Sequence, residues 1–251
     1  MSGLTWAAAW RVDRSVDIGS VALRLAAYQR DGLPVLAPIA GLRVVDEASA
    51  GAGRWHESTG VYGFLDLPPG PRRFVISDPA GRWLDREVSV AAPDRSALRT
   101  ALLAGAPPPV DAGPLWQDVA MYITAQQPIP SGNTVVWGVV SRGTAVVPSA
   151  FVSLTFVAQA GVRVYRGAAN AQGVYALWLR GLSFDDDTEP PTPPTLQAFA
   201  PRAGADVRLP AAFDGLIPGT PAFSALYQAP GVSRIGLLPL GARTRVDLTL
   251  P

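Results

Sequence analysis

A repeated hairpin signature constrains the fold of this chain more than any other feature. GVYGFLDLPPG at 60–70 and GVYALWLRG at 173–181 share Gly-Val-Tyr, a run of mostly apolar residues and a closing glycine turn. Glycine tolerates the backbone conformation of a tight turn, and successive residues after it fall on opposite faces of a strand. We expect Tyr62 and Tyr175 to anchor cores. The same β-element is therefore predicted in each half of the chain.

The features around the two signatures follow the same order in both halves. Each half gives a strand, a turn, a proline, a strand, a turn, the Gly-Val-Tyr strand, a glycine turn and a further strand. Pro38 lies 24 residues before Tyr62, and Pro148 lies 27 residues before Tyr175. The second half carries an additional polar, proline-rich segment, SFDDDTEPPTPP at 183–194, which predicts an inserted loop because proline is excluded from central strands.

The chain is therefore predicted to be all-β, with two tandem domains joined by a proline-rich linker. The expected boundaries are 1–104 for the first domain, 105–132 for the linker and 133–251 for the second domain, which includes the loop 183–194 and a long apolar tail. The proline run of the linker favours a stiff spacer. Its middle part, 115–124, is apolar enough to form a strand or a short helix.

The repeat resembles the carboxypeptidase regulatory-like domain, a transthyretin-like (prealbumin-type) β-sandwich. The second half carries Pro148, Ala150–Leu154 and Asn170–Tyr175 in the family's order. The first half carries Gly41–Val44 and Ser58–Phe64, with a good match in its hairpin and a weak one in its first strand. The resemblance covers about two-thirds of the chain and ends after Gly181. It implies a binding, spacing or stabilising role, usually non-catalytic, because such modules are appended to many kinds of protein.

Composition limits the partners and the compartment. The net charge is +1 and charged residues make up 16% of the chain, which gives no basic surface for nucleic acid. There is no cysteine, so disulfides and cysteine metal sites are excluded. The N-terminus lacks the pattern of a signal peptide, and no apolar run is long enough for membrane insertion. The default expectation is a cytoplasmic protein, or part of a particle released from the cell.

Candidate catalytic and metal-binding residues are few. His56 is the only histidine, in the turn GRWHESTG, and no Gly-x-Ser-x-Gly motif is present. We therefore expect no enzyme activity and no cofactor. The densest group of carboxylates is a weak calcium candidate, because calcium prefers oxygen ligands, although its spacing does not fit an EF-hand loop. Its members are Asp185, Asp186, Asp187 and Glu189.

Two groups of residues are candidates for contacts with other molecules. Exposed tryptophans would form a platform for sugars, so a carbohydrate-binding role stays open. The apolar tail is poor in charge and should pack on something, either its own domain or a partner. The candidates are Trp6, Trp10, Trp55 and Trp83, and in the tail Phe213, Leu216, Phe223 and Tyr227.

The leading functional hypothesis is a non-enzymatic structural or adaptor protein that contacts other subunits of a larger assembly. A phage tail or a phage-like contractile injection particle is one such assembly, and family analogy alone suggests it. The alternative is a carbohydrate- or peptide-binding module at a cell surface.

Overall fold

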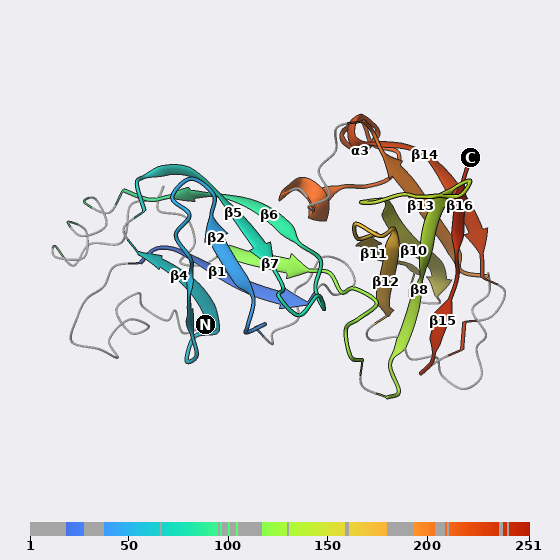
Figure 1. Cartoon of the computed structure of the whole chain (residues 1–251), viewed down its shortest axis with the longest axis horizontal. Coiled ribbons are helices and arrows are strands. Elements are labelled where there is room, and N and C mark those ends of the chain that lie inside the picture. Colours follow the sequence, from blue (N-terminus) through green and yellow to red (C-terminus); the bar gives the residue numbers. More distant parts are fainter. Residues whose placement is uncertain are drawn as a thin grey trace.

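The computed structural model describes most of the chain. The described residues are 19–27, 38–65, 67–94, 96, 100, 104, 117–129, 131–158, 161–179, 193–203, 209, 211–235, 238–239 and 241–251. Almost all regular structure in them is β-strand (Figure 1). The all-β prediction is confirmed.

Two sheets are built from the first half of the chain. One has the order β3-β4-β1-β7 and the other β2-β5-β6. Their facing side chains form one apolar core that contains Leu23, Phe64, Phe74 and Met121. The strands are β1 (Gly19–Ala27), β2 (Arg43–Asp46), β3 (Arg54–His56), β4 (Val61–Leu65), β5 (Gly70–Ser77), β6 (Arg86–Ala92) and β7 (Gln117–Met121).

Two further sheets are built from the second half. One has the order β11-β10-β13-β14, and the other has β12-β8-β15 with β9 and β16 also paired to β8. Between them lies a second core that includes Leu154, Tyr165, Tyr175 and Leu196. The elements are β8 (Thr134–Arg142), β9 (Ala145–Val146), β10 (Phe151–Ala158), β11 (Gly161–Ala168), β12 (Val174–Leu179), β13 (Thr195–Pro201), η3 (Ala211–Gly215), α3 (Pro221–Leu226), β14 (Tyr227–Arg234), β15 (Arg243–Arg245) and β16 (Leu248–Leu250).

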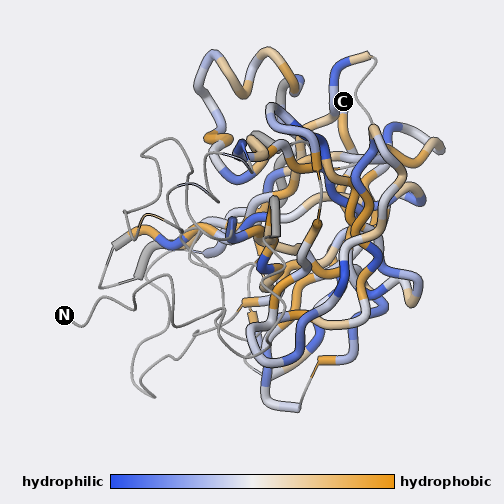
Figure 2. Tube along the Cα trace, turned by 90° about the vertical axis from the view of Figure 1, so that its left-hand side faces the viewer, coloured by the Kyte–Doolittle hydropathy of each residue, from blue (hydrophilic) through white to orange (hydrophobic). Residues whose placement is uncertain are grey.

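Alternation of apolar and polar residues explains why these segments form strands. In β6, Arg86, Val88 and Ala92 are buried, whereas Ser89 and Ala91 between them are exposed. Figure 2 shows hydrophobic and hydrophilic stretches alternating along the chain trace. A period of two places one set of side chains on the core face of the sheet.

The two Gly-Val-Tyr segments have matching places in the sheets. Gly60 and Gly173 have φ angles of +66° and +72°, which only glycine adopts at little cost. The strands that follow them, β4 and β12, pair antiparallel with β1 and β8. In each half, the strand on the other side of β1 or β8 runs parallel to it: β7 in the first half and β15 in the second.

The two repeated tyrosines bind the backbone of another segment. The Tyr62 hydroxyl accepts a hydrogen bond from the Leu42 amide at 2.8 Å and donates one to the Ile39 carbonyl at 3.1 Å. The Tyr175 hydroxyl donates to the Val246 carbonyl at 2.6 Å. Burial raises the pKa of both hydroxyls, because the charged form is poorly solvated there. Both tyrosines are core residues that also tie down an irregular segment.

The middle part of the expected linker is a strand, one of the two forms that its apolar composition predicted. Residues 117–121 within the range 105–132 form β7, which pairs with β1 from Leu23↔Gln117 to Ala27↔Met121. This part of the chain is a strand of the first half's sheet and not a spacer. The physical reason is its apolar face, since Val119 and Met121 are buried in the first core.

Candidate functional site at the joint between the halves

The two halves meet through a third apolar cluster. Aromatic rings surround Phe151, with ring centroids of Phe213, Phe223 and Tyr227 at 5.2, 5.0 and 5.6 Å from its own. Leu84, Ala120 and Tyr122 of the first half belong to the same cluster. The full set is Leu84, Ala120, Tyr122, Phe151, Ala168, Phe199, Leu209, Phe213, Leu216, Phe223 and Tyr227. We call this cluster, with the polar residues described next, the joint.

Arg86 lies buried at the joint with only 1% of its surface exposed. Its Nη1 atom donates to the Ala120 carbonyl and, at 3.0 Å, to Oδ1 of Asp214. Its Nη2 atom donates to Oδ2 of Asp214 at 2.5 Å. The ion pair therefore has the bidentate geometry that makes arginine–carboxylate contacts strong and directional. It joins β6 of the first half to η3 of the second.

Asp214 also accepts hydrogen bonds from Tyr122 and Arg166. The Tyr122 hydroxyl donates to its Oδ1 atom at 2.6 Å, and Arg166 of β11 donates to its main-chain carbonyl at 3.3 Å. The Arg86 guanidinium also lies 5.6 Å from the centre of the Tyr122 ring. The Nε atoms of Arg86 and Arg166 are buried without a hydrogen-bond partner. Two arginines thus bind Asp214, Arg86 at its carboxylate and Arg166 at its main-chain carbonyl.

Backbone hydrogen bonds also cross the joint. The Glu87 amide donates to the Leu209 carbonyl at 2.9 Å, and the Leu209 amide donates to the Asp85 carbonyl at 3.2 Å. Leu209 therefore extends the sheet of the first half at the edge of β6, in parallel orientation. The tail segment reaches from the second half toward the first (Figure 1). Covering an open strand edge removes unpaired backbone groups that would otherwise invite association.

A second contact area lies on the outer face of β8 and β12. Trp137 and Trp178 are half-buried there and pack against the first core, as do Ala125 and Ile129. Arg243 donates to the Ala125 carbonyl at 2.8 Å. Residues 121–125 are therefore buried or half-buried between the halves and Ile129 packs there as well, whereas Gln126 and Pro128 are exposed.

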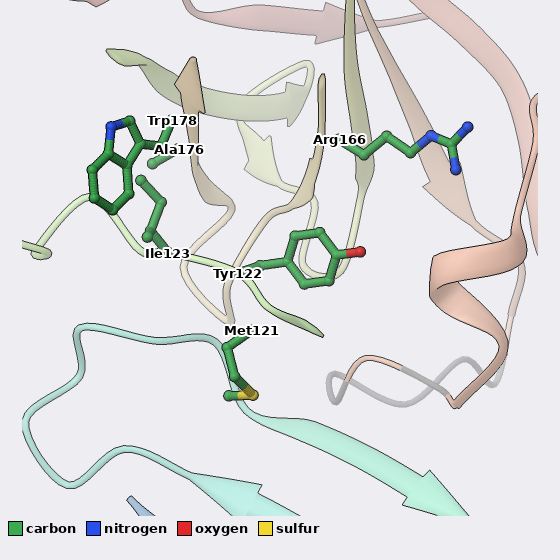
Figure 3. A pocket seen from close by; sticks show the side chains of 6 residues that line it. All are labelled: Met121, Tyr122, Ile123, Arg166, Ala176 and Trp178. Atoms are coloured by element: carbon green, nitrogen blue, oxygen red, sulfur yellow. The ribbon is translucent and has the colours of Figure 1, made fainter. Parts of the chain in front are cut away.

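A small pocket lies beside the joint. Met121, Tyr122, Ile123, Arg166, Ala176 and Trp178 line about 230 Å³ of empty space, open solvent included. Figure 3 shows the Tyr122 hydroxyl and the Arg166 guanidinium pointing to the same side, where both bind Asp214. Only about 10 Å³ of this space can hold the centre of a water molecule, so the pocket has room for about one water and not for a typical organic ligand.

Two buried carboxylates away from the joint shape turns. Burial alone would raise the pKa of Asp46, but hydrogen bonds from Arg72 and Ser49 outweigh it and hold this pKa below its ordinary value of 3.8. Asp78 behaves in the same way, with hydrogen bonds from Arg82 and from the amide of Ala80. Both acids are saturated with local donors, which is the arrangement of a structural turn.

The tryptophan candidates lie in different places. Trp55 is half-buried, with its ring centroid 5.0 Å from that of Tyr62. Trp83 is 7% exposed and belongs to the first core. Trp6 and Trp10 lie outside the described residues. The structure does not bring Trp55 and Trp83 together as an exposed platform.

The four tail candidates are all buried in the joint. Phe213, Leu216, Phe223 and Tyr227 are at most 5% exposed, and burial raises the pKa of Tyr227 to about 12. Their contacts are with their own chain, so in this conformation they present no surface to a separate partner. Of the two alternatives for the tail, its own chain or a partner, the structure shows packing on its own chain, in the space between the halves.

The remaining candidates are isolated from the joint. Asp185, Asp186, Asp187 and Glu189 lie outside the described residues. His56 is exposed, and its Nδ1 atom lies 3.1 Å from the Thr59 hydroxyl and 3.2 Å from that of Ser58. Within the described ranges, no group of three or more histidine, aspartate or glutamate side chains could hold a metal ion. No helix in these ranges is long and apolar enough to cross a bilayer.

Sequence reasoning missed Arg86 and Asp214, although both carry a signal. Arg86 shares the period-two face of Val88 and Ala92 in β6, which predicts a buried position. Asp214 is the only charged residue between positions 211 and 227. Buried charges need partners of opposite charge. Asp214 in its apolar segment and Arg86 on its core face meet that need for each other.

Comparisons with known proteins identify no family. No family model and no curated protein matches the chain. A streptococcal ancillary pilin shares 13% identity and a TM-score of 0.24 over 92% of this chain, which spans 62% of that structure. The shaft pilin SpaA from Lactobacillus rhamnosus GG shares 10% identity and a TM-score of 0.25, with 93% of this chain and 99% of that one covered. These scores are too low to carry an inference about fold or function.

Proposed function

We propose that the chain is a non-enzymatic structural or adaptor protein whose two halves act as one rigid body. The observation that carries this proposal is the joint. A bidentate ion pair with a buried arginine, backbone pairing through Leu209 and an aromatic cluster fix the halves against each other. Contacts between domains of one chain usually permit relative motion unless they are large and apolar. A fixed geometry suits a part that holds other subunits at a set distance.

The two halves are further proposed to be two copies of a transthyretin-like β-sandwich. Supporting this are the repeated Gly-Val-Tyr strands, the antiparallel partner on one side of β1 and β8, and the parallel partner on the other. The match is not complete, because β3 pairs with β4, whereas β11 pairs with β10 of the opposite sheet. A solved structure of either half compared with the other would test the duplication.

The partners are proposed to be protein subunits of a larger assembly. Sedimentation of a native lysate, followed by mass spectrometry of the proteins that travel with this chain, tests the proposal. Migration with a large particle supports it, and the companion proteins decide whether the particle is phage-tail-like, contractile-injection-like or another kind. Migration alone, at the 26.3 kDa of one chain, would contradict it. A glycan array with the wild type and a Trp55→Ala variant would then test the carbohydrate alternative.

A further inference from the structure

β1, the first strand that the structure describes in the first half and here called its entering strand, lies beside β7, its leaving strand. β1 and β7 are parallel neighbours with five consecutive register pairs, from Leu23↔Gln117 to Ala27↔Met121. Within this ladder Arg24 and Asp118 are register partners and form a salt bridge, with Nη2 to Oδ2 at 2.8 Å. The two strands are therefore held by backbone pairing and by a charged side-chain pair.

The second half repeats this arrangement with a longer ladder. β15 pairs in parallel with β8 from Arg243↔Val135 to Arg245↔Trp137, and β16 continues from Leu248↔Val140 to Leu250↔Arg142. Both strands keep the same register offset along β8. They therefore act as one interrupted strand, with three register pairs on each side of the interruption.

One backbone hydrogen bond and two side chains bridge the interruption at Val246 and Asp247. The Val246 amide donates to the Trp137 carbonyl at 2.8 Å, and the Val139 amide donates to Oδ1 of Asp247 at 2.9 Å. The Tyr175 hydroxyl holds the Val246 carbonyl. Asp247 thus supplies with its side chain the acceptor that a regular strand would supply with its backbone, so the ladder has no gap.

We propose that each half is a mechanical clamp that resists tension applied along the chain. In a parallel pair, the start of the entering strand and the end of the leaving strand lie at opposite ends of the ladder. Tension between these points slides one strand along the other, so all register pairs carry the force together. Tension between two ends on the same side would break the pairs one after another.

Only the biological use of the clamps rests on the structural role proposed above. The two clamps follow one another along the chain, and the joint lies between them. A subunit inside an assembly that is pulled or sheared would use this geometry to keep its shape. The clamp itself is a property of the isolated chain, so its test and the co-sedimentation test can fail independently.

Single-molecule pulling with two attachment geometries on the same ladder tests the clamp. The chain has no cysteine, so cysteines can be introduced as attachment points without side reactions. One variant pairs Ser131→Cys with a cysteine added after Pro251, which loads the β8 ladder along its length. The other pairs Thr144→Cys with the same added cysteine, which opens the ladder from the Leu250↔Arg142 end. Ser131, Thr144 and Pro251 are exposed.

The expected result is a peak unfolding force at least about twofold higher in the first geometry, since forced unfolding follows the barrier along the loaded direction. Equal forces in both geometries would overturn the proposal. In the first geometry, Asp247→Ala should lower the force, whereas Asp247→Asn, which keeps an acceptor for Val139, should retain it. If Asp247→Ala fails to fold, the comparison of the two geometries still decides the question.

Discussion

Removing Asp214 should strip the buried Arg86 of its counter-ion. The Asp214→Ala variant loses two hydrogen bonds from Arg86 and one from Tyr122. Removal of one partner from a buried ion pair costs about 3–5 kcal/mol, because a desolvated charge remains. Since the Asp214 side chain is 38% exposed, the lower end of this range applies. We expect the free energy of unfolding to fall by about 3 kcal/mol.

Replacing Arg86 by methionine is the matched control. Methionine fills much of the same volume. The Asp214 carboxylate, which loses its counter-ion, is 38% exposed to solvent and keeps its hydrogen bond from Tyr122, so the change should stay within about 1.5 kcal/mol of the wild type. In the double variant, Asp214→Ala should add only about 1 kcal/mol to the effect of Arg86→Met, for the lost Tyr122 hydrogen bond. The resulting coupling energy should be about 2 kcal/mol, as measured by a double-mutant cycle.

Urea denaturation followed by tryptophan fluorescence measures these changes, with a calorimetric scan beside it. The wild type should unfold in one transition because the joint couples the two cores, whereas Asp214→Ala should separate the transition into two. Asp214→Asn, which keeps an acceptor for Tyr122 or Arg86, should lie between the wild type and the alanine variant. A loss below about 0.5 kcal/mol for Asp214→Ala, in the range of ordinary surface substitutions, would refute the argument.

Three further predictions concern single positions. Gly138→Ala should lower the free energy of unfolding by about 3 kcal/mol or more, because its added Cβ would lie 1.9 Å from the Val246 carbonyl oxygen. Gly132→Ala is the control, because Gly132 has a φ of +85° but open space around it, and it should cost only about 1–2 kcal/mol. Thermal denaturation compares the two variants. Tyr175→Phe should cost about 1–2 kcal/mol in the same assay, since the Val246 carbonyl loses its donor. The pKa of Asp46 is lower in the folded state than its ordinary 3.8, so the stabilisation by its carboxylate is present above pH 3.8 and is lost as the pH falls through the folded pKa. The difference between the urea midpoints at about pH 6 and about pH 3 should therefore be smaller in Asp46→Asn than in the wild type.

The sequence predicted the local β-structure because its signals are local. The Gly-Val-Tyr segments, their glycine turns and the alternation after them depend on neighbouring residues, and the structure has strands at both places. The signal for β7 was weaker: the apolar stretch 115–124 predicted a strand or a short helix, and five residues of QDVAM carry too little periodicity to decide between the two. Its strand character comes from pairing with β1, which is distant in the sequence: Arg24 of β1 and Asp118 of β7, which form an ion pair, are 94 residues apart.

The joint could not be predicted from neighbouring residues for a similar reason. Arg86 and Asp214 are 128 residues apart, and no local pattern pairs one arginine with one aspartate among many. The apolar tail gave a correct general expectation, namely that it packs on something. Its partner could not be predicted, because the faces it covers on β6 and β10 come from both halves.

The stretch 117–133 links the joint to the two clamps. It contains β7, the leaving strand of the first clamp, then Tyr122 and the residues that pack between the halves, and it ends where β8 begins. Tension that passes from one clamp to the next is therefore carried in part by packed structure, at 121–125. Weakening the joint with Asp214→Ala should let the halves extend at low force before either clamp yields, whereas weakening the second clamp with Asp247→Ala should lower only the later peak.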